Sequence, residues 1–204
     1  MSGIDVRKYR ALIGELAALV RLARTALGGA TAALMEPGGA SDGVPAAEKA
    51  LAELRGRVED DAATTSAEPS AVVVGVHVGT AVEGLGRLAE RLLQVAWSRR
   101  DSEPLPERVG VPLRGLADTA LALLTRSAAV LEDGGAVGVA DLLSDLHDVA
   151  RRQRLLYELL LLDPSPVASG EAADVALLSC YYQQCAEHAA AIARHAVLFG
   201  RGRT

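Results

Sequence analysis

Aromatic side chains are scarce in this chain of 204 residues, where Phe, Trp and Tyr together make up 3%. Half of the residues are hydrophobic, so a core has to be built mainly from Ala, Leu and Val. Small and straight-chain apolar residues favour closely packed helices over sandwiches of β-sheets. The length fits one domain or two small ones.

Cysteine and net positive charge are also in short supply. Cys180 and Cys185 are the only cysteines, and five residues apart on a helix they point to different faces, which excludes a disulfide framework. The formal net charge of −5 argues against general nucleic-acid binding, which needs a basic surface to displace counterions. Local basic pairs such as Arg99-Arg100 and Arg151-Arg152 are typical of solvated helix faces.

Long apolar runs are absent as well. The longest, Leu155 to Leu162, contains Glu158 and is far shorter than the roughly 20 residues of a membrane-spanning helix. Glu15 interrupts the apolar stretch near the N-terminus, so no signal peptide is predicted. We therefore expect a cytoplasmic protein that reaches a membrane only through a partner.

Clusters of Pro, Gly and Ser divide the chain into six segments, with breaks near residues 37–45, 64–70, 101–110, 133–137 and 163–170. Between the breaks, apolar residues recur at spacings of three and four, as in Val74, Val78, Ala81, Leu85 and Leu88. No segment alternates with period two over a useful length. The pattern predicts six helices and no sheet, with Leu88 and Ile192 in the core.

An internal repeat relates the two halves. The residues Leu22 to Leu27 return as Leu116 to Leu121, with only the third position changed. A looser echo joins Val82–Leu93 to Tyr182–Ala193, in which Ala89 matches Ala189. We predict an all-α fold of two tandem pseudo-repeated three-helix bundles, residues 1–104 and 105–204.

Catalytic signatures are missing. Ser98, Ser127 and Ser179 lie within predicted helices and have no nucleophile-elbow motif around them. His188 and His195 are two helical turns apart, too far to share one metal ion directly, and the chain has no Glu-x-x-His. We expect a protein that is not an enzyme, with a metal-dependent enzyme on a helical bundle as the open alternative.

Carboxylates form one stripe, because Asp141, Asp145 and Asp148 recur at i, i+4 and i+7. Such a stripe could hold a hard cation, which takes oxygen ligands. It could equally be a solvated face whose acids pair with Arg151 or Arg152. The same five residues are our candidates for a partner-binding surface.

The two-repeat pattern resembles the PhoU-type phosphate-uptake regulators. The resemblance is closest in the last predicted helix, from Asp174 through Tyr181-Tyr182-Gln183-Gln184-Cys185-Ala186-Glu187-His188-Ala189 to the ending Ile192–Gly200. The family carries an acidic pair, E/D-x-x-x-D, in each half, and in some relatives these pairs bind metal clusters.

In this chain the family's acidic pairs are degenerate. They fall on Glu83 and Arg87 in the first half and on Gln183 and Glu187 in the second. An arginine repels a cation and an amide is a weaker ligand than a carboxylate. We therefore expect no bound cofactor, with magnesium, iron and zinc as open alternatives. Glu187 and the Asp141/Asp145/Asp148 stripe are the remaining candidate ligands.

The resemblance implies a non-enzymatic regulator of phosphate uptake and phosphate-responsive signalling. It would act as a helical docking protein between a phosphate ABC transporter and a sensor histidine kinase. A homodimer is expected because symmetric dimers are the commonest oligomers. A helical scaffold that has diverged from phosphate control is a further alternative.

Overall fold

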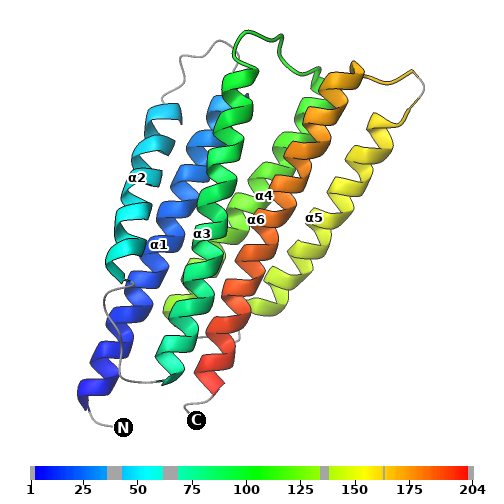
Figure 1. Ribbon diagram of the computed structural model, residues 1–204. Coiled ribbons are helices and arrows are strands. Elements are labelled where there is room, and N and C mark those ends of the chain that lie inside the picture. Colours follow the sequence, from blue (N-terminus) through cyan, green and yellow to red (C-terminus); the bar gives the residue numbers. More distant parts are fainter. Residues whose placement is uncertain (1–2, 36–42, 62–68, 134–137, 163, 202–204) are drawn as a thin grey trace.

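The computed structural model describes residues 3–35, 43–61, 69–133, 138–162 and 164–201, and within these ranges it contains six α-helices and no strand (Figure 1). An all-α fold with six helices is thus confirmed for the described ranges. The helices are α1 Gly3–Met35, α2 Gly43–Asp61, α3 Pro69–Ser98, α4 Glu107–Asp133, α5 Val139–Leu160 and α6 Ser169–Arg201.

The helix ends agree with the predicted breaks to within a few residues. α3 ends at Ser98 and α4 begins at Glu107, so the expected boundary between halves lies in their connection. Pro45 lies in the first turn of α2, where its missing N–H would have no partner in the helix anyway. Gly138 precedes α5 with φ 95°, a left-handed conformation that glycine adopts without a steric penalty.

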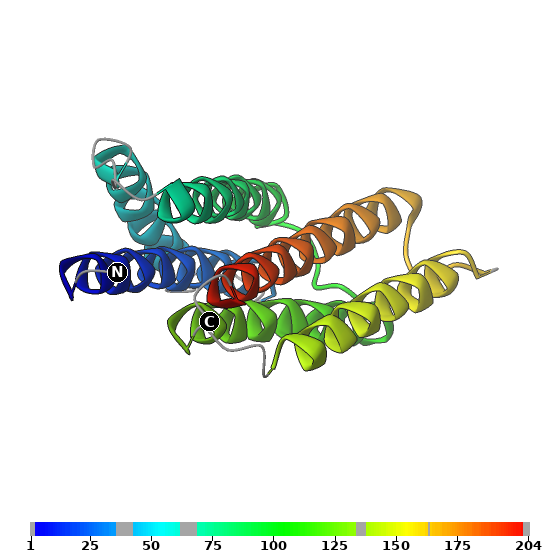
Figure 2. The same ribbon diagram turned by 90° about the horizontal axis from the view of Figure 1, so that it is seen from below.

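The four helices α1, α3, α4 and α6 pack together, and the two shorter helices flank them (Figure 2). α2 packs on α1 and α3, while α5 packs on α4 and α6. α1 begins and α6 ends at the same end of the molecule (Figure 1). Each flanking helix therefore covers a groove between two long helices of its own half of the chain.

Ala, Leu and Val dominate the core, as the composition predicted. Leu88 and Ile192 have 3% and 0% of their surface exposed, which confirms both as core residues. Tyr182 is the largest fully buried side chain, and its hydroxyl donates to Thr31 Oγ1 at 3.0 Å. Thr31 in turn donates to the carbonyl of Leu27 at 2.8 Å, so this buried polar chain is satisfied.

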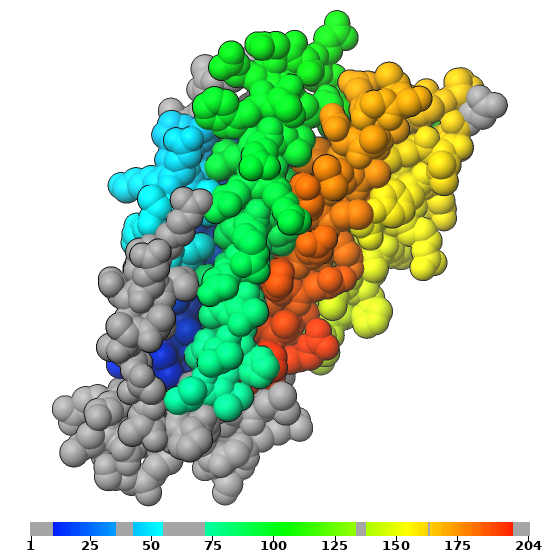
Figure 3. All heavy atoms as spheres, in the orientation of Figure 1, coloured from blue at the N-terminus to red at the C-terminus, as the bar shows by residue number. Residues whose placement is uncertain are grey.

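α3 and α6 run antiparallel along one face of the molecule, where Figure 3 shows their side chains side by side. His77 stacks on His195, the Arg91 guanidinium lies 5.8 Å from the centre of the Tyr181 ring, and Arg99 pairs with Asp174. The first step moves fourteen residues along both helices, and the second moves eight residues beyond Arg91 and seven before Tyr181. Contacts that recur at multiples of about seven residues are typical of antiparallel helices whose axes are nearly aligned.

α3 is also apolar. Its stretch Val72–Ser98 contains an 18-residue window with a mean hydropathy of 1.3 and is long enough to cross a membrane by length and composition alone. The length of the uninterrupted apolar runs did not predict this. Half of its apolar window is buried inside the protein. Core helices of soluble proteins pass the same test, so this feature indicates a core helix as readily as a span.

Candidate functional site

Two of the three aspartates in the acidic stripe on α5 form ion pairs. Asp145 accepts a hydrogen bond from Arg126 of α4. Asp148 pairs with Arg151 one turn later, at 3.2 Å. Asp141 lies in the first turn, where a negative charge is stabilised by the helix dipole. Two of the three predicted cation ligands are therefore paired with arginine. The Asp148–Arg151 pair is one that the solvated-face interpretation expected, whereas the partner of Asp145 lies on another helix.

The five candidate docking residues split into two groups. Asp145 is held toward α4 by Arg126, and the Arg152 guanidinium approaches Gly115 of α4 to within 3.5 Å of where a Cβ would stand. Asp141 and Arg151 remain exposed, and Asp148 keeps about half of its side chain in solvent. Arg152 is itself exposed, so Asp145 is the one residue of the five that an ion pair holds to another helix.

The positions that the resemblance aligned with acidic pairs form contacts within their own helices. Arg87 lies 3.7 Å from Glu83 on α3, and the Gln183 amide donates to Glu187 at 3.0 Å on α6. The Gln183 carbonyl oxygen is buried without a hydrogen-bond donor. Across the described residues, no three or more His, Cys, Asp or Glu side chains gather closely enough to hold a metal ion. That the purified protein carries no stoichiometric iron or zinc stays a prediction.

The His188 ring of α6 lies against α3 at Gly84. A Cβ added to Gly84 of α3 would lie 2.6 Å from the His188 ring, so the missing side chain makes room for the imidazole. Burial lowers the pKa of His188; Glu187 acts to raise it and Arg87 to lower it further. Arg87 and Glu187, which are matching positions in the sequence repeat, thus both influence the pKa of His188. Sequence spacing did not predict this.

A polar cluster between α5 and α6 was also missed. The Tyr157 hydroxyl lies 3.0 Å from Cys180 Sγ, and the Gln153 amide donates to that hydroxyl at 3.0 Å. Burial raises the pKa of Tyr157. Burial likewise raises the pKa of Cys185 to about 12, so that thiol is inert packing. The cluster joins two helices through shared hydrogen bonds.

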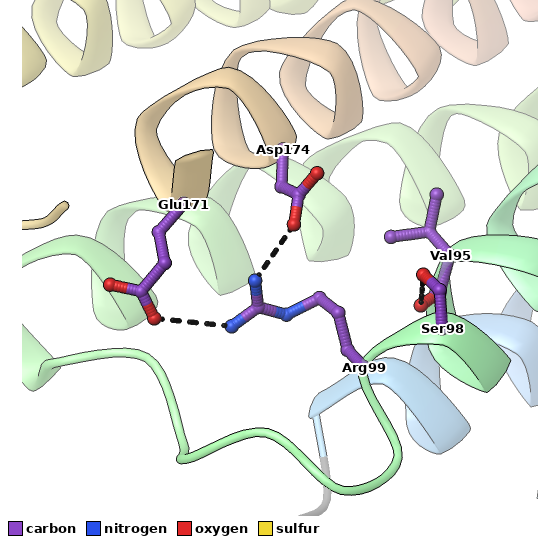
Figure 4. Close-up of polar contacts among 5 residues, drawn as sticks. All are labelled: Val95, Ser98, Arg99, Glu171 and Asp174. Atoms are coloured by element: carbon purple, nitrogen blue, oxygen red, sulfur yellow. Dashed lines mark hydrogen bonds and ion pairs between the residues drawn. The ribbon is translucent and has the colours of Figure 1, made fainter. Parts of the chain in front are cut away.

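Arg99 forms a clamp between the end of α3 and the start of α6 (Figure 4). Its Nη1 donates to Asp174 at 2.9 Å, and its Nη2 lies 3.6 Å from Glu171. Only 11% of the Arg99 side chain is exposed, so its assignment to a solvated basic pair was wrong. The neighbouring Ser98 hydroxyl donates to the carbonyl of Val95 at 2.9 Å, as Figure 4 also shows.

A cleft of about 380 Å³ opens between α1 and α4. These helices also run antiparallel. Arg21, near the middle of α1, pairs with Glu132, near the end of α4. Arg114, near the start of α4, donates to the carbonyl of Met35 at the end of α1. The residues that line the cleft are Arg24, Asp118, Leu121, Ala122, Thr125 and Arg126. It combines apolar side chains with charges of both signs, and sequence analysis had not singled it out.

Comparison with known proteins gives the chain no family assignment: no family model matches it, and no curated protein does either.

Proposed function

We propose that the protein is a non-enzymatic regulator of phosphate uptake and phosphate-responsive signalling, similar in architecture to the PhoU-type regulators. It would act by docking between a phosphate ABC transporter and a sensor histidine kinase. The two-repeat arrangement of three-helix bundles and the possible homodimer belong to the same proposal. The observation that carries it is the correspondence between the two halves.

The burial pattern of α3 returns in α6 one hundred positions later. Leu85 and Cys185, Ala89 and Ala189, and Leu92 and Ile192 are buried at matching positions. The two halves also have the same plan, since α1, α2 and α3 pack on one another as α4, α5 and α6 do. Antiparallel pairing of α1 with α4 and of α3 with α6 is the relation that a two-fold axis between equivalent halves would produce.

Binding, and not turnover, is the mode of action that the described residues support. They contain no metal cluster and no nucleophile that hydrogen-bonds to a base. The docking surface we propose is the outer face of α5, where the charged Asp141, Asp148 and Arg151 precede Leu155, which is 54% exposed, along the helix. An exposed apolar anchor next to charged side chains is a common way for a helix face to select a partner.

Deleting the protein should change the expression of phosphate-responsive genes at high phosphate, where a negative regulator acts. The double variant Asp141→Arg with Asp148→Arg should reproduce part of that defect while keeping the helical circular-dichroism signal. Asp145 is left unchanged because it holds Arg126 of α4. A matched control is Glu103→Arg, an exposed acid in the connection between α3 and α4.

Unchanged phosphate uptake and unchanged transcription in the deletion strain, at both high and low phosphate, would overturn the proposal. A helical scaffold unrelated to phosphate control would then replace it. A control variant as defective as the α5 variant would show that α5 is not the docking face.

A further inference from the structure

The cleft between α1 and α4 places opposite charges at equivalent positions of the internal repeat. Arg24 lies in Leu22–Leu27 and Asp118 in Leu116–Leu121, and the five other residues of these two stretches are identical. Both side chains line the cleft. The copies differ at one position only, and that position supplies Arg24 of α1 and Asp118 of α4 to the lining of the cleft.

Neither charged group has an ion-pair partner among the described residues. Arg24 and Asp118 form no ion pair with each other and no hydrogen bond to another described residue, although they line the same cleft. Their full donor and acceptor capacity is therefore available to a molecule in the cleft. An arginine presents five N–H donors and a carboxylate accepts through two oxygens.

Arg126 adds a second guanidinium to the positive side. Its Nη2 is anchored on Asp145, which fixes the guanidinium in place, while its Nε is buried without an acceptor. Because that Nε has almost no exposed surface, a ligand in the cleft reaches Arg126 through the 43% of its side chain that is exposed. The Thr125 hydroxyl already donates to the carbonyl of Leu121 and keeps its lone pairs for a further donor.

We propose that this cleft binds a small soluble phosphomonoester that also carries an ammonium group. Two guanidinium groups from different helices suit a phosphate, which offers more acceptor oxygens and more charge than a carboxylate. Asp118 supplies the acceptor for the ammonium, and Leu121 with Ala122 contacts the short carbon chain between the two ends. A volume of about 380 Å³ is at the small end of ligand sites, which fits a compact molecule.

Three compounds that share the same two-carbon chain separate the contributions of the two ends. O-phosphoethanolamine carries both charged groups, ethyl phosphate lacks the ammonium, and ethanolamine lacks the phosphate. Each is titrated at low ionic strength into the ¹⁵N-labelled full chain, and the amide shifts are followed. O-phosphoethanolamine should bind saturably with shifts concentrated on α1 and α4. The other two should bind at least about tenfold more weakly, the factor that one charge-assisted hydrogen bond supplies.

Variants assign each end to a residue. Arg24→Gln should weaken both phosphates about tenfold. Asp118→Asn should remove the preference for O-phosphoethanolamine over ethyl phosphate. Arg100→Gln, just after α3, is the matched control, an arginine in an ion pair outside the cleft, and should bind like the original chain. All three residues are exposed, and circular dichroism checks that each variant keeps its helices.

The proposed binding site is independent of the proposed regulatory role, because it is tested by titration with small compounds and not by measuring transcription. It is overturned if O-phosphoethanolamine does not bind saturably, if its preference survives Asp118→Asn, or if the shifts map away from α1 and α4. Arg24-dependent sedimentation with phosphatidylethanolamine vesicles, without binding of the soluble compound, would overturn the assignment to a free molecule.

Discussion

His77 of α3 and His195 of α6 lie face to face, with their ring centroids 4.2 Å apart and their planes 6° from parallel. Burial lowers the pKa of His195, and the neighbouring His77 and Arg194 lower it further. His188, two turns earlier on α6, also has a lowered pKa, caused first by burial. The pairing of α3 with α6 therefore contains two histidines that favour their neutral form.

Acidification should destabilise the fold through these histidines. A lowered pKa in the folded state means that the unfolded chain binds more protons as the pH falls through about 6.5, so the free energy of unfolding decreases between pH 7.5 and 5.5. Urea denaturation at both pH values measures the change. The double variant His188→Gln with His195→Gln should show a smaller decrease, whereas His147→Gln, on the exposed side of α5, should not. An equal decrease in the double variant would show that other groups are responsible.

Truncating the core between the halves should be costly. Leu88→Ala and Ile192→Ala each remove a buried side chain, and each should lower the free energy of unfolding by about 2–5 kcal/mol. Leu161, which is 84% exposed, provides the control, since Leu161→Ala should change the stability by less than about 0.5 kcal/mol. A melting temperature unaffected by Leu88→Ala would mean that α3 is packed through a different face.

Two adjacent glycines in α1 should respond in opposite ways. A Cβ on Gly28 would meet nothing within 4 Å, so Gly28→Ala should stabilise the helix by about 0.5–1 kcal/mol. A Cβ on Gly29 would lie 2.6 Å from the carbonyl oxygen of Gly43 and 2.9 Å from the amide nitrogen of Ala47, both backbone atoms of α2. Gly29→Ala should therefore destabilise by about 1–3 kcal/mol. Equal thermal shifts for both variants would contradict the close approach of α1 and α2.

Two adjacent arginines provide a similar comparison. Arg99→Ala removes a mostly buried guanidinium from Asp174 and Glu171, and should cost about 1–3 kcal/mol because charged hydrogen bonds are lost. Arg100 is 60% exposed and lies 3.7 Å from a fully solvated Asp101, so Arg100→Ala should cost less than about 0.5 kcal/mol. Chemical denaturation of both variants tests the difference, and the deficit of Arg99→Ala should also shrink in high salt. A cost for Arg100→Ala as large as that for Arg99→Ala would contradict the clamp.

The sequence predicted the helices and their core faces because both depend on local spacing. Three-four periodicity located Leu88 and Ile192 correctly, and Pro and Gly clusters marked the helix ends. Contacts between distant segments were not predictable in this way, because spacing does not say which helix lies beside which. Arg99 looked solvated until the first turns of α6 were seen to meet it. Asp145 looked like a cation ligand until Arg126 of α4 was seen beside it.

The candidate site followed the same rule. The repeat itself was visible in Leu22–Leu27 and Leu116–Leu121, and the difference between Arg24 and Asp118 could be read from it. That the two residues share a cleft depends on the antiparallel packing of α1 against α4, to which no local pattern corresponds.

The opposite charges of Arg24 and Asp118 bear on why two copies of a bundle would be joined in one polypeptide. A symmetric homodimer carries the same residue on both sides of its axis, so it can place two arginines or two aspartates there but never one of each. In the proposed two-repeat arrangement, a single gene encodes both sides separately, and each can mutate alone. Fusion thereby permits an asymmetric recognition surface at the centre of an otherwise symmetric scaffold, which an assembly of identical subunits cannot evolve.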